Sequence, residues 1–178
     1  LYGQNDNFDL EKSHVLPALI RKCHLAKLAY ANDVEAIVVD EARYGAIPED
    51  IRTSLGISSN KPPKVILWGS GSPYREFLHV DDMASASLFL MRQNTSQLSS
   101  YPSRLFNVGV GSDITIRSLA ELVQEIVGFE GEIIWDSSKP DGTPRKLMDV
   151  SLLNQMGWKS RISLEAGINS VYKIYSSK

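Results

Sequence analysis

Apolar residues recur at three- and four-residue steps along much of the chain, which is the spacing of helices with one buried face. The first such helix is expected over about 14–29, with Ser13 as its N-cap. Further helical patterns run from Asp81 to about Gln93, from Thr115 to Gly128, and near 151–156 and 164–176. Short apolar runs of strand length lie at 64–68, 75–80, 105–109 and 132–136. Strands that alternate with helices predict an α/β fold with about four strands.

Residues 31–60 differ from the rest of the chain in composition. The stretch holds two bases against six acids, Asp33, Glu35, Asp40, Glu41, Glu49 and Asp50, and it ends in glycine, serine, asparagine and proline. We interpret residues 1–178 as a single domain that carries this stretch as an inserted surface segment. An added lid or an oligomer contact is the alternative, but a surface elaboration needs no function.

Composition and charge exclude several classes of protein. The 178 residues are 43% hydrophobic and 22% charged, as in a folded domain, and 19 basic residues against 21 acidic ones argue against nucleic acid as a partner. No apolar run reaches the ~20 residues of a membrane span, so we expect a soluble, cytoplasmic protein. One cysteine and three scattered histidines predict no metal site. The chain begins at Leu1 in a turn-rich stretch, so we expect a piece of a longer protein.

Glycine-rich turns that begin at Gly69 and Gly109 follow two of the predicted strands. Neither completes the G-x-G-x-x-G fingerprint of dinucleotide-binding proteins, because the third glycine is absent from both. Trp68 and Arg75 flank the first of these turns. An aromatic face and a planar cation can together stack a base and clamp a phosphate. From the residues alone, a core tryptophan and a surface arginine are favoured instead.

Two further groups of residues carry candidate chemistry. Asp141 and Lys146 lie in a loop braced by two prolines, which suits either a binding site or a solvated charged turn. His14 opens the first helix, where a histidine can act as an acid or base but more often packs or caps. Cys23, on the apolar face of that helix, is interpreted as a small hydrophobic residue.

Four runs of the sequence together resemble the C-terminal half of the GDP-L-fucose synthase family, within the extended short-chain dehydrogenase/reductases. They are LYGQNDNFDLEKSHVLPALIRK, WGSGSPYREFLHVDDMA, FNVGVG and SKPDGTPRKLMDVSLLNQMGW. The resemblance covers nearly the whole chain except residues 31–60, for which it offers no counterpart. It implies an α/β substrate-binding domain whose cofactor-binding Rossmann half is missing.

The resemblance also implies an activity for the whole protein. Members of the family use NADPH to invert C3 and C5 of GDP-4-keto-6-deoxy-D-mannose and to reduce its C4 ketone, giving GDP-L-fucose, and they form homodimers. Their glycine-rich fingerprint, Tyr-x-x-x-Lys pair and catalytic serine and cysteine all precede the equivalent of Leu1, so we expect this chain to be inactive alone. The alternatives are a non-catalytic GDP-sugar-binding module and an epimerase or dehydratase of another nucleotide sugar; SKPDGTPRK argues against the latter.

Residue by residue, the resemblance assigns roles to seven positions. His14 matches the acid of the epimerisation and lies with Leu1 at the nicotinamide end of the cofactor. The positions that match substrate contacts are Lys22, Trp68, Arg75, Asp141 and Lys146. Arg21, the neighbour of Lys22, is a candidate to share its role. Glu132 departs from the pattern, because some relatives carry a base there.

Overall fold

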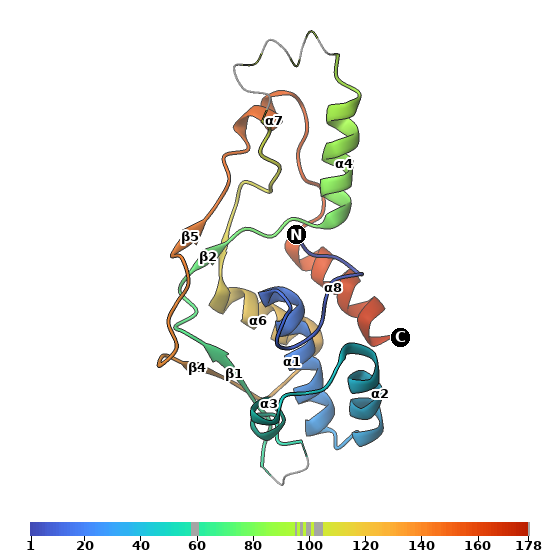
Figure 1. The fold of residues 1–178 in the computed structure, drawn as a ribbon, viewed down its shortest axis with the longest axis vertical. Helices are drawn as coiled ribbons and strands as arrows, with labels where there is room; N and C mark the ends of the chain where they lie inside the picture. Colours follow the sequence, from blue (N-terminus) through green and yellow to red (C-terminus); the bar gives the residue numbers. More distant parts are fainter. Residues whose placement is uncertain (58–60, 95, 97, 99–100, 102–104, 178) are drawn as a thin grey trace.

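The computed structural model describes residues 1–57, 61–94, 96, 98, 101 and 105–177, and Figure 1 shows helices and strands interleaved along the chain. The elements are α1 (Val15–Tyr30), α2 (Val34–Tyr44), α3 (Glu49–Ser54), β1 (Lys64–Trp68), β2 (Tyr74–Arg75), α4 (Val80–Met91), β3 (Ile114–Thr115), α6 (Ile116–Val127), β4 (Glu132–Asp136), β5 (Arg145–Lys146), α7 (Ser151–Gln155) and α8 (Leu164–Ser176). This arrangement confirms the predicted α/β class. Within the described ranges, no helix is both long enough and apolar enough to cross a membrane.

The strands form two small sheets. β1 pairs in parallel with β4, from Lys64 opposite Glu132 to Trp68 opposite Asp136. Along β1 the buried side chains are Val65 and Leu67, so Trp68 faces outward by the alternation of a strand. In the other sheet, β2 lies between antiparallel β3 and parallel β5.

The main core lies between α1, α6 and α8, with β1 against it (Figure 1). α1 buries the apolar face that its periodicity predicted, namely Leu16, Leu19, Ile20, Cys23 and Ala26. A smaller cluster joins α4 to the region of α7 through Leu78, Ala86, Leu153 and Trp158. The molecule is therefore extended, with α4 and α7 at one end and α2 and α3 at the other (Figure 1).

The predicted helix boundaries agree with the structure to within about two residues, but one predicted cap is wrong. Thr115 caps α6 by accepting a hydrogen bond from the Ser118 amide at 3.0 Å, and the helix ends at Gly128 in the left-handed conformation. The prediction that Ser13 caps α1 is wrong, because the helix begins at Val15 and its N-cap residue is His14. His14 therefore lies at the N-terminus of α1, where it is exposed.

Two predicted strands differ from the structure. The predicted strand at 75–80 is reduced to Tyr74–Arg75, and residues 105–109 form no strand. The backbone just beyond residue 109 bonds to a side chain instead, since the amides of Val110 and Gly111 donate to the Glu76 carboxylate at 2.6 Å each. A carboxylate can replace a neighbouring strand as the acceptor for such amides.

The 31–60 segment forms α2 and α3 and contributes to the core. Ile37, Ile47 and Leu55 are buried in the main apolar cluster. Asp40 of α2 is also buried and forms an ion pair with Arg21 of α1 at 2.8 Å. The segment is thus integrated with the domain, and its status as an insertion stays a prediction.

Candidate functional site

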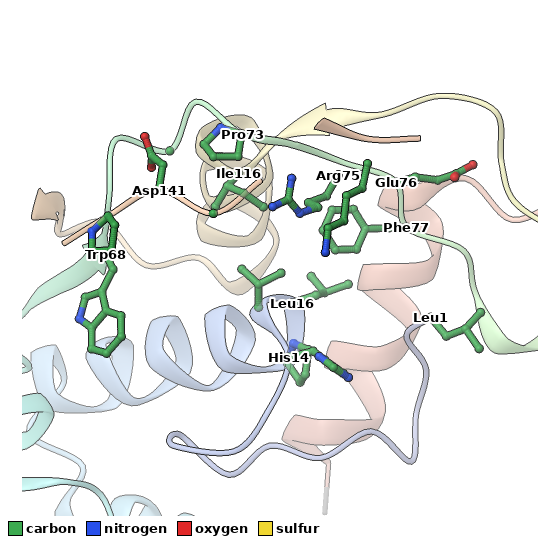
Figure 2. Close-up of a pocket in the computed structure, with 16 residues that line it drawn as sticks. Leu1, His14, Leu16, Trp68, Pro73, Arg75, Glu76, Phe77, Ile116 and Asp141 are labelled. Atoms are coloured by element: carbon green, nitrogen blue, oxygen red, sulfur yellow. The ribbon is translucent and has the colours of Figure 1, made fainter. Parts of the chain in front are cut away.

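A cavity of about 410 Å³ opens at the N-terminal end of α1, between that helix, β2 and the loop before β5. Figure 2 shows His14 below Arg75, with Trp68 and Leu1 at opposite ends of the view. Six of the seven residues singled out by the sequence line this cavity, namely Leu1, His14, Trp68, Arg75, Asp141 and Lys146. Segments up to 145 positions apart in the sequence are thereby brought to one place.

The two cations of the cavity are held side by side by strand pairing. Arg75 of β2 and Lys146 of β5 are register partners in a parallel pair, so their side chains leave the same face of the sheet. Gly142 leaves room for the guanidinium, because a Cβ there would lie 3.2 Å from Arg75 Nη2. Adjacent Arg and Lys side chains in a cavity are suited to an anionic group such as a diphosphate.

The Asp141 carboxylate ties two loops of the cavity together. It accepts hydrogen bonds from the Ser70 amide at 2.8 Å and the Ser70 hydroxyl at 2.6 Å, and these bonds lower the pKa of Asp141. The carboxylate lies against Gly69, which has a φ of +80° and no space for a Cβ. Asp141 is therefore engaged with the glycine turn that follows Trp68, and its bonds join two loops that line the cavity.

Glu76 was not identified from the sequence, although it lies next to Arg75 and lines the same cavity. Besides Val110 and Gly111, its carboxylate accepts a hydrogen bond from the Met148 amide at 3.2 Å. It thus holds the loop after residue 109 and the chain after β5 against β2. The charge patterning around Arg75 gave no signal for this role, because the partners are backbone amides.

Replacing Glu76 with alanine should lower stability more than replacing it with glutamine. The alanine variant leaves three amides without their acceptor, whereas glutamine retains one acceptor oxygen, and hydrogen bonds to a charged group contribute about 1.5–3 kcal/mol each. We expect the melting temperature to fall in the order wild type, Glu76→Gln, Glu76→Ala, as measured by circular dichroism. Equal melting temperatures for all three proteins would contradict this role.

His14 is presented to the cavity by the start of α1. As the N-cap residue it has an extended backbone, and its side chain makes no capping hydrogen bond. The ring is exposed and lines the cavity at the start of α1, below Arg75 in the view of Figure 2. An imidazole in this position can exchange a proton with a molecule in the cavity.

Trp68 is an exposed aromatic side chain rather than part of the core, contrary to the interpretation favoured from the residues alone. It is 71% exposed at the end of β1, and Lys139 Nζ lies 5.5 Å from the centre of its ring. The alternation of buried and exposed residues in β1 accounts for its position. Exposed tryptophan faces at the edge of a cavity are suited to stacking a flat ligand.

Lys22 lies one step away from the main cavity. It lines two adjoining cavities, of about 600 and 210 Å³, that both share Trp68 with the main one. Burial lowers the pKa of Lys22, and the nearby Asp50 carboxylate opposes that shift. The expectation that Arg21 shares this role is wrong, because its side chain is fully buried and bonded to Asp40.

The remaining candidates fall outside the cavity. Cys23 is buried in the core, where desolvation raises the pKa of its thiol to about 12, in agreement with a packing role. Glu132 pairs with Lys64 across the β1–β4 ladder at 3.0 Å. Among the described residues, no group of three or more histidine, cysteine or acidic side chains is placed to hold a metal ion.

Two curated relatives of this chain, one from a plant and one from a bacterium, are both named as GDP-L-fucose synthases. The chain is 47% identical over 175 residues to the putative GDP-L-fucose synthase 2 of Arabidopsis thaliana, a match that covers 98% of this chain and 42% of the relative. It is 42% identical to the GDP-L-fucose synthase of Escherichia coli K12, covering 97% of this chain and 45% of that protein. The chain therefore spans less than half the length of these curated relatives.

Solved structures share the fold. The crystal structure of a GDP-6-OMe-4-keto-L-xylo-heptose reductase from Campylobacter jejuni matches with a TM-score of 0.83 and 39% identity, covering 99% of this chain and 51% of that one. The model of the NAD dependent epimerase/dehydratase family matches residues 1–109, which include Leu1, His14, Lys22, Trp68 and Arg75. The chain belongs to the NAD dependent epimerase/dehydratase family.

Proposed function

We propose that this chain is the sugar-nucleotide-binding part of an NADPH-dependent GDP-4-keto-6-deoxy-D-mannose 3,5-epimerase/4-reductase that makes GDP-L-fucose. The observation that carries the proposal is the single cavity in which His14, Trp68, Arg75 and Lys146 meet. The names of the Arabidopsis and Escherichia coli relatives support the same activity. Because the chain spans less than half of those proteins, the activity is proposed for the whole protein.

The cavity supplies the groups that such a substrate needs. Arg75 and Lys146 are placed for the diphosphate, and Trp68 presents a ring face at the end of the cavity. The hydrogens on the carbons next to a ketone are acidic, so a positioned side chain can remove or return them. His14 is the exposed imidazole in this cavity, and we assign to it the delivery of a proton to C3 and C5.

The residues of the chain fit one edge of a nicotinamide site. Leu1 and His14 line the same cavity, which therefore offers both an apolar side chain and an imidazole. We propose that these two residues contact the cofactor, while most of NADPH is bound by residues outside this chain. When bound, NADPH supplies the hydride that reduces the C4 ketone.

Consumption of NADPH by the whole protein tests the proposed activity. With GDP-4-keto-6-deoxy-D-mannose added, the absorbance of NADPH at its reduced-state maximum should fall, and the 178-residue chain alone should give no change. Substrate binding by the whole protein without NADPH oxidation would contradict the enzyme proposal and favour a non-catalytic GDP-sugar-binding module.

A second candidate is a C4 reductase that acts on a GDP-linked keto sugar without epimerising it. The matching Campylobacter structure, named as a GDP-6-OMe-4-keto-L-xylo-heptose reductase, favours this candidate at 39% identity. Both candidates need the same diphosphate-binding cations and the same hydride. They differ in whether hydrogens at C3 and C5 exchange with solvent, which is the property to measure.

Replacing Arg75 with methionine should weaken binding of GDP by about 10- to 100-fold, because a charge-assisted hydrogen bond to phosphate contributes roughly 1.5–3 kcal/mol. Titration calorimetry of the whole protein with GDP provides the measurement. Arg92→Met is the matched control, since Arg92 is the exposed C-cap residue of α4 and does not line the cavity. Equal losses in the two variants, or none in Arg75→Met, would show that Arg75 does not bind the diphosphate.

The proposal includes a homodimeric, cytoplasmic whole protein with no nucleic-acid partner and no membrane partner. The dimer and the location rest on the resemblance to the GDP-L-fucose synthase family. The near balance of 19 basic and 21 acidic residues supports the absence of a nucleic-acid partner.

A further inference from the structure

A second cavity, of about 600 Å³, continues the candidate site beyond Trp68. Trp68 lines both this cavity and the one that holds Arg75 and Lys146. The new cavity is bordered by Lys22 from α1 and by Asp50 from α3. A ligand whose anionic part lies beside Arg75 can therefore extend past the tryptophan ring toward α3.

α3 is held firmly enough to form a wall of this cavity. The Glu41 carboxylate of α2 accepts a hydrogen bond from Arg52 of α3, and it also accepts one from the Ile47 amide at 3.0 Å. Leu55, the residue that follows α3, is buried in the core. The helix itself packs against β1, and the two lie side by side in Figure 1. These contacts hold α3, the helix that carries Asp50, against α2 and β1.

The two cavities differ in the groups they offer. The cations Arg75 and Lys146 line the first, where the carboxylates of Asp141 and Glu76 are engaged with loop hydrogen bonds. The second adds the exposed carboxylates of Asp50, on α3, and of Glu11, on the loop before α1; of these two, Asp50 is the one that acts electrostatically on Lys22 in the same cavity. Asp136 also lines it, but one oxygen of that carboxylate already accepts two hydrogen bonds from Ser138, at 2.6 and 3.0 Å.

We propose that Asp50, on the 31–60 segment, is a specificity-determining residue that recognises the guanine base of the sugar nucleotide. The inference rests on the proposed function, which places the diphosphate beside Arg75, and it adds that the base lies beyond Trp68 in the second cavity. Guanine carries two donors on one edge, the N1–H and the 2-amino group, and a carboxylate can accept both. Adenine has an unprotonated N1 and no 2-amino group, so the same carboxylate faces a lone pair.

The arrangement gives the 31–60 segment a role in the site. The resemblance to the synthase family has no counterpart for this stretch, yet its α3 supplies a charged wall at the base end of the cavity. Lys22 lies across the same cavity, and its ammonium interacts electrostatically with Asp50. Those two charges orient a base that offers both donors and a carbonyl acceptor, as guanine does.

Titration calorimetry with GDP and ADP on the whole protein tests this inference, because the two ligands differ only in the base. The wild type should bind GDP more tightly than ADP. Asp50→Ala should weaken GDP binding by about 10-fold or more and leave ADP binding within about twofold, since only the guanine donors lose their acceptor. Glu49→Gln is the matched control, because Glu49 is the adjacent exposed carboxylate of α3 and does not line the cavity.

The outcomes separate this inference from the proposed function. A GDP-to-ADP preference that collapses in Asp50→Ala and persists in Glu49→Gln supports the role of Asp50. Tight GDP binding with the same preference in all three proteins would overturn it and leave the proposed function intact. Failure of the wild type to bind either nucleotide would refute the proposed function, and the inference with it. Circular dichroism of each variant verifies that the fold is retained.

Discussion

The His14→Gln variant of the whole protein should lose hydrogen exchange at C3 and C5 of the keto sugar by about 100- to 10,000-fold, the usual contribution of a positioned acid or base. Glutamine keeps the approximate size and polarity of the side chain but cannot supply a proton near neutral pH. The backbone of α1 should be undisturbed, because the His14 side chain makes no capping hydrogen bond and is exposed.

Deuterium incorporation from heavy water, followed by mass spectrometry of the sugar nucleotide, measures this effect directly. GDP affinity should change by less than about threefold, because the diphosphate contacts at Arg75 and Lys146 are retained. Lys12→Ala, an exposed change two residues earlier on the same loop, serves as the control. Unchanged incorporation in His14→Gln would remove His14 from the catalytic role and leave it as a residue of the cavity wall.

The second large effect concerns stability. Arg21→Met should destabilise the fold by about 3–5 kcal/mol, because it leaves the buried Asp40 carboxylate without its counter-ion. Arg21 donates to Asp40 at 2.8 Å and also to the carbonyl oxygens of Phe8 and Tyr44, at 3.1 and 2.8 Å. Tyr175 of α8 donates to the same carboxylate, so the network joins α1, α2 and α8.

Urea unfolding followed by tryptophan fluorescence gives the free energies needed, with the exposed Arg92→Met variant as control. Replacing both partners, as Arg21→Met with Asp40→Leu, should cost less than the sum of the single changes, because no charge is then left buried. A loss below about 1 kcal/mol in Arg21→Met would mean that water reaches the pair and that the network does not hold α2 to the core.

Periodic elements of the fold were predictable, whereas short ones were not. α1 and α6 bury long apolar stripes, and β1 and β4 are continuous apolar runs, so each has a pattern of its own. β3 and β5 contain two residues each and depend on pairing with β2, which no local pattern reveals. The core contribution of 31–60 was hidden for a related reason, because its many charges masked the buried apolar positions.

The candidate site was predictable only in part. Local patterns alone favoured a core position for Trp68 and a packing role for His14, and the family resemblance brought the cavity residues into one hypothesis. The role of Glu76 was not predicted, because its carboxylate accepts hydrogen bonds from backbone amides far along the chain. Asp50 was not predicted to lie near the site, because its position there depends on how α3 packs beside β1.

The most direct test of the central claim is the isotope content of the product made by the whole protein from GDP-4-keto-6-deoxy-D-mannose and NADPH in heavy water. The account predicts a 6-deoxy-hexose product with one deuterium at C3, one at C5 and unlabelled hydrogen delivered to C4. A reduced product without deuterium at C3 and C5 would contradict the epimerase assignment and identify a C4 reductase, and the absence of any product would leave a binding module.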